Sequence, residues 1–190
     1  MTTEAQFETT GWYALSVRNN KVLEARDQLA AACAETYVPM AVREDARGRI
    51  VPCPAVSRLL FVRTTSDALV ELEKISVVVP GRYPFFVYRG LDRRPQRIPE
   101  SQMRMFMLVS SAGPDAGLVY IDPLPAPTLK SGQRVRVTEG VFRGTEGYVR
   151  RVRRDRRVVV QIEGLCAVAL PFIHASFLQP LPSDNVTSDN

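Results

Sequence analysis

The chain has 190 residues, 45% hydrophobic and 24% charged, a composition typical of a globular protein with one large or two small domains. No hydrophobic run approaches the roughly 20 residues that span a bilayer. The first residues lack the basic start and hydrophobic stretch of a signal peptide, so we expect a cytoplasmic protein without membrane contact. The three cysteines, Cys33, Cys53 and Cys166, are widely spaced, which argues against a disulfide framework and against a zinc site.

The first part of the chain predicts strands alternating with helices. Residues 11–17 are rich in aromatic and hydrophobic side chains, which favours a strand. Asn19 and Asn20 are suited to cap a following helix. Hydrophobic residues at three- and four-residue spacing give that helix one buried face; they are Val22, Ala25, Leu29 and Cys33.

The middle of the chain predicts more strands around a central one. Residues 37–42 favour a second strand, and residues 44–49 a charged turn. The run 56–62 is almost continuously hydrophobic, which is typical of a central strand. A short helix is predicted to begin at a Ser66 cap, with Asp67 favourable near its positive end.

Two further strands and a last helix complete the predicted first domain. The strands, 75–79 and 85–88, have branched and aromatic side chains and are separated by the turn signal Pro80-Gly81. The helix begins within 98–102, with Pro99 suited to its first turn. Its buried stripe is formed by Met103, Phe106 and Met107, a pattern that favours core packing over a ligand pocket.

Residues 113–127 contain four prolines and two glycines without periodicity, which indicates a semi-extended linker between two domains. The predicted first domain spans 11–112 and the second 128–181, with disordered tails at 1–10 and 182–190.

The second domain predicts a small, curved antiparallel barrel. Residues 134–137 alternate between arginine and valine, and strands follow at 148–152 and 157–162. Gly140, Gly144 and Gly147 lie between the first two, at spacings suited to a tight turn and a bent strand. Further strands are expected at about 167–170 and 177–181.

Residues 132–149, GQRVRVTEGVFRGTEGYV, resemble a KOW motif, the SH3-like module of ribosomal proteins and NusG-type factors. The first-domain element order and the linker extend this resemblance to the NusG family of transcription elongation factors. The resemblance also rests on Trp12-Tyr13, on residues 59–62 and on the Ile98-Pro99 helix start. It implies an α+β fold: an NGN-type α/β sandwich, in which helices flank an antiparallel sheet, followed by a KOW barrel.

The resemblance implies a non-enzymatic elongation or antitermination factor that suppresses pausing. The first domain would hold the coiled-coil clamp helices of the largest RNA polymerase subunit in a concave hydrophobic patch. The candidates for that patch are Trp12, Tyr13, Val56 and Leu59, with core packing as the alternative for each. Arg18 and Lys21 match a face that contacts non-template DNA in specialised relatives; ordinary helix-surface charge is their alternative.

The resemblance also implies that the KOW domain of a monomeric factor recruits a ribosomal protein or a termination factor, or contacts nascent RNA. Many relatives carry Pro-Gly-Tyr or Pro-Ser-Tyr where this chain has Ser57-Arg58-Leu59. This departure and the short loop at 44–49 resemble the specialised branch that includes RfaH and the UpxY-type antiterminators. One relative refolds its second domain from helices to a barrel, but β-branched residues 158–160 and the glycines oppose a helix here, which predicts a permanent barrel.

Six arginines occupy the eight residues 150–157, RRVRRDRR. Two interpretations remain open: a solvated hairpin tip, or a surface that contacts phosphates or an acidic partner. The arginines are Arg150, Arg151, Arg153, Arg154, Arg156 and Arg157.

No residue pattern predicts catalysis, a cofactor or a metal. The single histidine, His174, has no neighbouring nucleophile signal, and the glycines form neither a dinucleotide-binding nor a Walker motif. The alternative function from another class is a KOW-containing RNA-binding or ribosome-associated protein without polymerase contact.

Overall fold

The computed structural model describes residues 10–113, 116–121 and 132–182. The chain forms two compact units, Met1–Met103 and Arg104–Asn190, and the division falls within helix α3 (Glu100–Ser110). The predicted tails and residues 122–127 of the predicted linker lie almost entirely outside the described residues.

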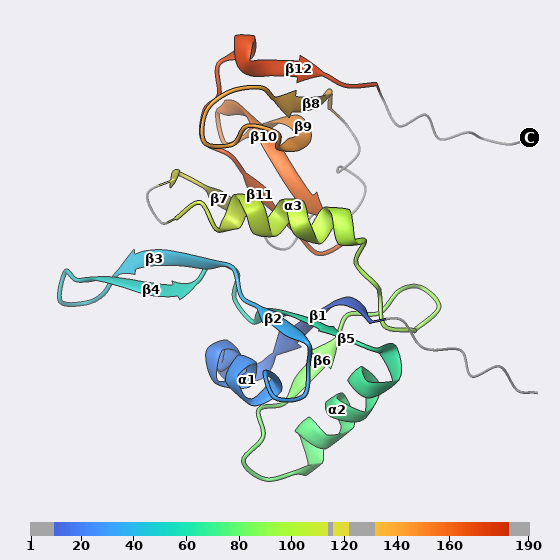
Figure 1. Cartoon of the computed structure of the whole chain (residues 1–190). Helices are drawn as coiled ribbons and strands as arrows, with labels where there is room; N and C mark the ends of the chain where they lie inside the picture. The colour runs from blue at the N-terminus through green and yellow to red at the C-terminus, as the bar shows by residue number, and fades with distance from the viewer. Residues whose placement is uncertain (1–9, 114–115, 122–131, 183–190) are drawn as a thin grey trace, which may run out of the picture. The chain divides into compact units, whose positions relative to one another are not determined.

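The first unit contains a four-stranded antiparallel sheet in the order β2-β5-β1-β6 (Figure 1). The predicted strand at 11–17 is β1, and the hydrophobic run at 56–62 supplies β5, so both lie at the centre of the sheet. The strand bounds are β1 (Gly11–Val17), β2 (Glu35–Tyr37), β5 (Leu59–Thr64) and β6 (Phe85–Val87).

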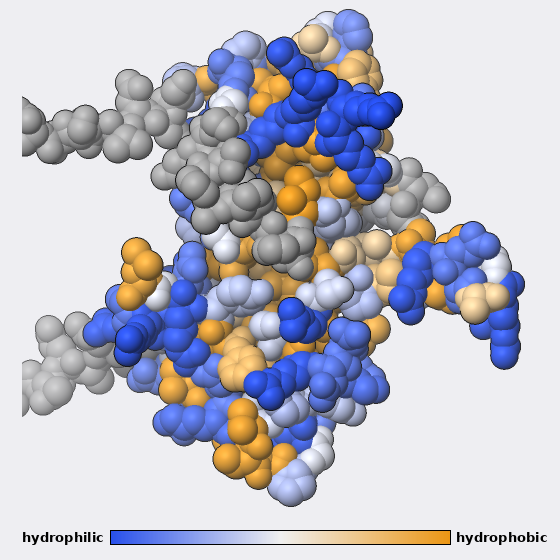
Figure 2. All heavy atoms as spheres, turned by 180° about the vertical axis from the view of Figure 1, so that it is seen from behind, coloured by the Kyte–Doolittle hydropathy of each residue, from blue (hydrophilic) through white to orange (hydrophobic). Residues whose placement is uncertain are grey.

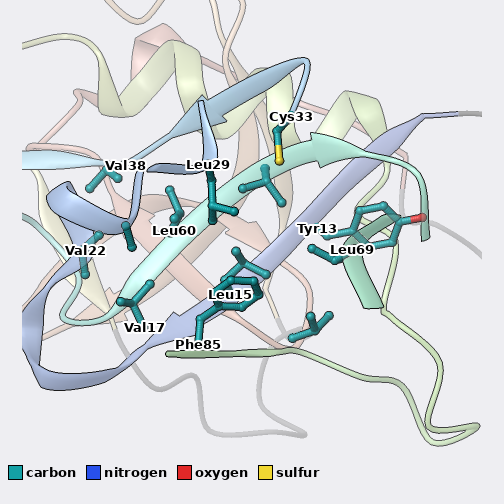
Figure 3. Close-up of a cluster of buried hydrophobic side chains, with 13 residues drawn as sticks. Tyr13, Leu15, Val17, Val22, Leu29, Cys33, Val38, Leu60, Leu69 and Phe85 are labelled. Carbon is teal, nitrogen blue, oxygen red and sulfur yellow. The ribbon is translucent and has the colours of Figure 1, made fainter. Parts of the chain in front are cut away.

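Helices α1 (Val22–Leu29) and α2 (Ser66–Val78) cover one face of this sheet. Figure 3 shows Val22 and Leu29 from α1 and Leu69 from α2 among the strand side chains Tyr13, Leu15, Val17, Leu60 and Phe85. The alternation of β1 explains the pattern, since every second residue of a strand faces the same side. We call this side the helix-covered face.

The predicted cap of α1 is wrong. Neither Asn19 nor Asn20 caps the helix; Lys21 occupies the N-cap position without a side-chain hydrogen bond. The two asparagines instead have φ angles of 58° and 54°, in the left-handed region that asparagine tolerates better than most residues. They turn the chain between β1 and α1 through the 3₁₀ segment η1 (Arg18–Asn20).

Helix α2 is longer than predicted and includes the expected strand 75–79 up to Val78. Its N-cap is Thr65, one residue before the predicted Ser66, and the Thr65 hydroxyl accepts a hydrogen bond from Ala68 N–H at 3.3 Å. Its β-branched end remains helical because the helix is fixed to the sheet: Glu73 accepts the Val87 N–H at 2.8 Å, and Ser76 is buried. Tertiary contacts here outweigh strand propensity.

The predicted second strand is divided into two. Residues after β2 leave the sheet at Val38-Pro39, and β3 (Met40–Glu44) pairs only with β4 (Ile50–Pro54). This two-stranded hairpin extends from the unit in Figure 1, and its outer end is predominantly hydrophilic in Figure 2. The predicted charged turn closes it, where Asp45 accepts the N–H groups of Arg47 and Arg49.

The second unit is built on a six-stranded antiparallel sheet in the order β12-β8-β9-β10-β11-β7. Strand β7 differs from prediction, because it lies within the expected linker. Its residues Val, Tyr and Ile suit a strand, and they pair with β11. The bounds are β7 (Val119–Ile121), β8 (Arg134–Val137), β9 (Glu146–Val152), β10 (Asp155–Ile162), β11 (Cys166–Ala169) and β12 (Leu178–Pro180).

The KOW glycines have two different structural roles. Gly140 and Gly144 have φ angles of 80° and 85° in the turn between β8 and β9. Gly147 lies within β9, where an added Cβ would be 2.6 Å from the Val159 carbonyl oxygen, so a side chain would collide with the neighbouring strand. The motif therefore shapes the turn and the close packing of the sheet.

His174 has a structural role at the start of η4 (Ala175–Phe177), the short helix that precedes β12. Its Nδ1 accepts the Ser176 N–H at 3.3 Å and lies 2.8 Å from the Ser176 hydroxyl.

Candidate functional site

The predicted docking residues Trp12 and Tyr13 lie on opposite sides of β1. Tyr13 is 4% exposed and belongs to the core of the helix-covered face, where Figure 3 shows its ring near Leu69. Trp12 pairs with Arg63 of β5 and lies on the other side, which we call the second face. Tyr13 therefore does not lie at a sheet margin, and core packing accounts for it.

The second face is rich in aromatic side chains. Residues directly opposite each other in an antiparallel sheet share a face. Trp12 pairs with Arg63, Ala14 with Phe61 and Ser16 with Leu59. Tyr37 pairs with Phe61, Glu35 with Arg63 and Phe86 with Ser16. The second face thus comprises Trp12, Ala14, Ser16, Glu35, Tyr37, Leu59, Phe61, Arg63 and Phe86.

Only part of this face is accessible. Trp12 and Leu59 are 2% and 3% exposed, and Val56 is equally buried. Phe86 is 45% exposed, and Tyr88, which continues the alternation after β6, is 36% exposed. The hydrophobic surface that a partner can reach is therefore at the β6 edge of the face.

Two side-chain contacts organise the margins of the second face. The Arg18 guanidinium lies 4.5 Å from the centroid of the Phe86 ring, a cation–π arrangement. At the β2 edge, Arg63 Nη1 and Glu35 Oε1 are 2.7 Å apart, and the hydrogen bond from Arg63 to Glu35 raises the Arg63 pKa. The face thus has a basic and aromatic β6 margin and an ion-paired β2 margin.

In the turn before β5, Arg58 occupies the position of the glycine in Pro-Gly-Tyr. Arg58 has a φ of 65°, in the left-handed region where glycine is favoured, and its carbonyl accepts the Val17 N–H at 2.8 Å. This chain therefore keeps the backbone that a glycine would adopt and places an exposed arginine there. Leu59 follows and is buried.

Lys21, the other basic residue predicted to contact DNA, is neutralised by a carboxylate of helix α1. Lys21 is exposed, and its Nζ lies 2.8 Å from Glu24 Oε1. The hydrogen bond to Glu24 raises the Lys21 pKa and lowers the Glu24 pKa. Of the two predicted basic residues, Arg18 is the one beside the exposed aromatic ring.

The six arginines of 150–157 form the end of the β9–β10 hairpin in the second unit. Arg151 faces Arg156 and Arg150 faces Arg157 across the two strands. Four are exposed, whereas Arg150 and Arg157 are half-buried. Burial lowers the pKa of Arg150.

A carboxylate between two arginines lies on the same sheet. Glu146 of β9 receives a hydrogen bond from Arg136 Nε at 3.0 Å and one from Arg134 Nη2 at 3.0 Å, both from β8. These contacts, first the hydrogen bond from Arg136, lower the pKa of Glu146. Arg134 and Arg136 are therefore partly neutralised, unlike the four exposed arginines at the hairpin end.

The described part of the chain contains no candidate metal centre. Its histidine, cysteine, aspartate and glutamate side chains form no group of three that could hold a metal ion. All three cysteines are free thiols, and burial raises the pKa of Cys33. A groove of about 230 Å³ between α1 and α2 is lined mainly by hydrophobic side chains, including Leu29, Leu72 and Ile75.

A family model described as "Transcription termination factor nusG" matches residues 10–107. The chain belongs to the NusG family. A search of curated proteins found no match. The matched range covers the four-stranded sheet, both of its helices and most of α3. Members of this family are transcription factors without an enzymatic activity of their own.

Family membership confirms the predicted resemblance and the α+β fold class of this NusG-family chain. No helix among the described residues combines the length and hydrophobicity needed to cross a membrane. Sequence reasoning missed Phe86 and Tyr88 as accessible aromatic residues. The alternation of the sequence Phe-Phe-Val-Tyr could have separated them from Phe85 and Val87, which are buried on the helix-covered face.

Proposed function

We propose that this NusG-family protein is a transcription elongation or antitermination factor whose first unit binds RNA polymerase through the β6 edge of the second face. Family membership supports the transcription role. The observation that carries the docking site is the pair of accessible aromatic side chains, Phe86 and Tyr88, beside the buried Trp12 and Leu59. Hydrophobic side chains held by a rigid sheet suit the clamp helices of the largest polymerase subunit.

The four residues first predicted for docking have different roles in this proposal. Trp12 and Leu59 lie on the second face but are buried, Val56 is also buried, and Tyr13 belongs to the core of the helix-covered face. Phe86 and Tyr88 make the direct contacts. Arg18, stacked on Phe86, adds a positive charge at the same margin, where it can meet non-template DNA or an acidic polymerase side chain.

The two accessible rings provide a testable share of the affinity. An aromatic side chain buries about 150–250 Å², so the exposed part of each ring amounts to roughly 80 Å². At about 25 cal/mol per Å², complete burial of both contributes at most about 4 kcal/mol before ordering costs. Even with two thirds of this gain offset by ordering costs, their loss should weaken polymerase binding about tenfold, since about 1.4 kcal/mol corresponds to a factor of ten.

The test is a pull-down with core RNA polymerase. The Phe86→Ser plus Tyr88→Ser variant should lose most of the polymerase that the wild type retains. The matched control is Val77→Ser plus Val78→Ser, which removes side chains that are 60% and 74% exposed on α2 instead of on the second face. Circular dichroism first establishes that both variants are folded.

Retention by the control with loss in the Phe86 and Tyr88 variant supports the docking face. Equal binding by both variants would place the contact elsewhere. If the wild type recovers ribosomes or RNA but no polymerase, the alternative KOW-centred function replaces this proposal. Assignment to the RfaH and UpxY-type branch and recruitment of a ribosomal protein or termination factor through the second unit stay predictions.

A further inference from the structure

The positive charge of the whole chain is concentrated in one hairpin end. Residues 150–157 contain six arginines and one aspartate, a net charge of +5. The rest of the chain contains 19 basic and 19 acidic residues, so it has no net charge. The formal charge of +5 for the whole protein is therefore that of eight residues in the second unit.

The strand register places like charges directly opposite each other. Arg151 pairs with Arg156, and Arg150 with Arg157, so two successive cross-strand positions hold arginine on both strands. Opposed like charges destabilise a sheet, because the Cβ atoms of such pairs are only about 5 Å apart. The one carboxylate of the hairpin end, Asp155, is 3.5 Å from Arg157 and does not separate Arg151 from Arg156.

The turn between the strands adds a second local cost. Arg153 has a φ of 58°, a conformation for which glycine or asparagine is the usual residue. Arg151, Arg153, Arg154 and Arg156 are exposed and form no salt bridge with any described carboxylate. The hairpin thus presents four exposed guanidinium groups, three of them at positions where folding alone would favour other residues.

We propose that the end of the β9–β10 hairpin is a binding site for the phosphodiester backbone of a nucleic acid. Guanidinium groups match phosphate oxygens in a planar, bidentate geometry, and neighbouring phosphates relieve the repulsion between the paired arginines. A two-stranded ribbon is also one of the elements that the major groove of B-form DNA admits.

Two observations favour a nucleic acid over an acidic protein. The exposed residues of 150–157 include no hydrophobic side chain, since Val152 is half-buried, whereas the core of a protein interface is rich in aromatic residues and methionine. The run also lacks aromatic residues on which unpaired bases could stack, so contacts to the backbone dominate. This site is independent of polymerase docking.

Fluorescence anisotropy with the full-length protein tests the site without polymerase. The probes are a labelled DNA duplex, an RNA duplex of the same sequence and the corresponding single strands. With four phosphates contacted on a DNA duplex, log K should fall with log salt at a slope near −3.6, so affinity falls about 150-fold between 50 and 200 mM salt. The probe that is bound most tightly identifies the nucleic acid.

The Arg151→Gln plus Arg156→Gln variant should reduce that slope to about −1.8 and weaken binding at 50 mM salt at least tenfold. Arg104→Gln plus Arg143→Gln is the matched control, because it removes two exposed arginines outside the hairpin and changes the net charge equally. The control should keep a slope near that of the wild type. Thermal denaturation should show both variants folded.

Three outcomes would overturn the proposal. The first is equal binding and an equal slope for the hairpin variant and the wild type. The second is no binding of any of the probes at 50 mM salt. The third is displacement of the nucleic acid by polyglutamate at the same charge concentration, which would assign the hairpin to an acidic protein partner.

Discussion

Glu73 joins helix α2 to β6, the strand at one edge of the first sheet. It accepts the Val87 N–H at 2.8 Å and a hydrogen bond from Arg89 Nη1 at 3.1 Å, and its side chain is only 14% exposed. Burial alone would raise the pKa of Glu73. The hydrogen bonds from Arg89 and Val87 outweigh that effect, so the pKa lies below its ordinary value of 4.5.

We predict that Glu73→Gln lowers the free energy of unfolding by about 1.5–3 kcal/mol at pH 7, because hydrogen bonds to a charged group are lost. A carboxylate with a lowered folded-state pKa stabilises fully above its unfolded-state pKa and loses that contribution as the pH falls through the folded value. Urea denaturation of both proteins between pH 7 and pH 3 checks this. If the wild type and the variant differed as much in free energy of unfolding at pH 3 as at pH 7, the assignment would be contradicted.

Arg58 keeps the backbone conformation of a glycine although its side chain is different. The sequence departs from Pro-Gly-Tyr, yet the backbone at Arg58 has the positive φ that glycine would adopt. The departure therefore changes the side chain and keeps the turn. It weakens no part of the family assignment, which rests on residues 10–107.

At the scale of elements, two KOW glycines make a matched pair for mutation. A Cβ at Gly147 would be 2.6 Å from the Val159 carbonyl oxygen, whereas at Gly144 it would meet nothing within 4 Å and only the φ of 85° opposes it. We expect Gly144→Ala to cost about 1–2 kcal/mol. Gly147→Ala should cost more, because backbone atoms of β10 must move.

Urea denaturation of the full chain, followed by a signal from the second unit, measures both glycine variants. A larger effect of Gly144→Ala than of Gly147→Ala would mean that β9 and β10 can move apart with little loss in the free energy of unfolding. Equal effects would mean that backbone conformation alone determines the role of both glycines.

Most elements could be predicted because their periodicity is strong. The strands β1, β5 and β10 and the hydrophobic face of α1 follow directly from the spacing of valine, leucine and aromatic residues. The end of α2 could not, since Ile75 and the three valines 77–79 favour a strand until the contacts of this segment with the sheet are known. Strand β7 was missed because three residues between prolines carry too little pattern.

The candidate site was less predictable than the fold for a simple reason. Trp12 and Tyr13 are adjacent and equally aromatic, and only the pairing register determines which side each one faces. Likewise, the sequence shows six arginines, but only the register shows that four of them oppose each other in two pairs. Long-range pairing is the information that a local pattern lacks.

At the scale of the whole molecule, the permanent-barrel prediction can be made more specific. Strand β7 pairs with β11, so a fragment of the second unit should begin before Val119 and include it. We expect far-UV circular dichroism of residues 113–190 to show strands, and the whole chain to show the same strand signal plus that of residues 1–112. Val158, Val159 and Val160 lie in β10 and support this expectation.

The result that would contradict the prediction is extra helix in the whole chain beyond the sum of the two fragments. Such a spectrum would mean that the second unit changes fold when it is joined to the first. A mixture of the separate fragments is the control, because it keeps the composition and removes the covalent link.

The uneven charge also determines how the protein meets a distant polyanion. Residues 150–157 have the densest positive charge of the chain, so long-range attraction should favour approaches in which this hairpin end faces the polyanion. Encounter would then be oriented as well as accelerated. Salt screens this orienting attraction over about 8–10 Å at physiological ionic strength, and over shorter distances at higher salt. In high salt the protein should therefore meet a polyanion without a preferred orientation.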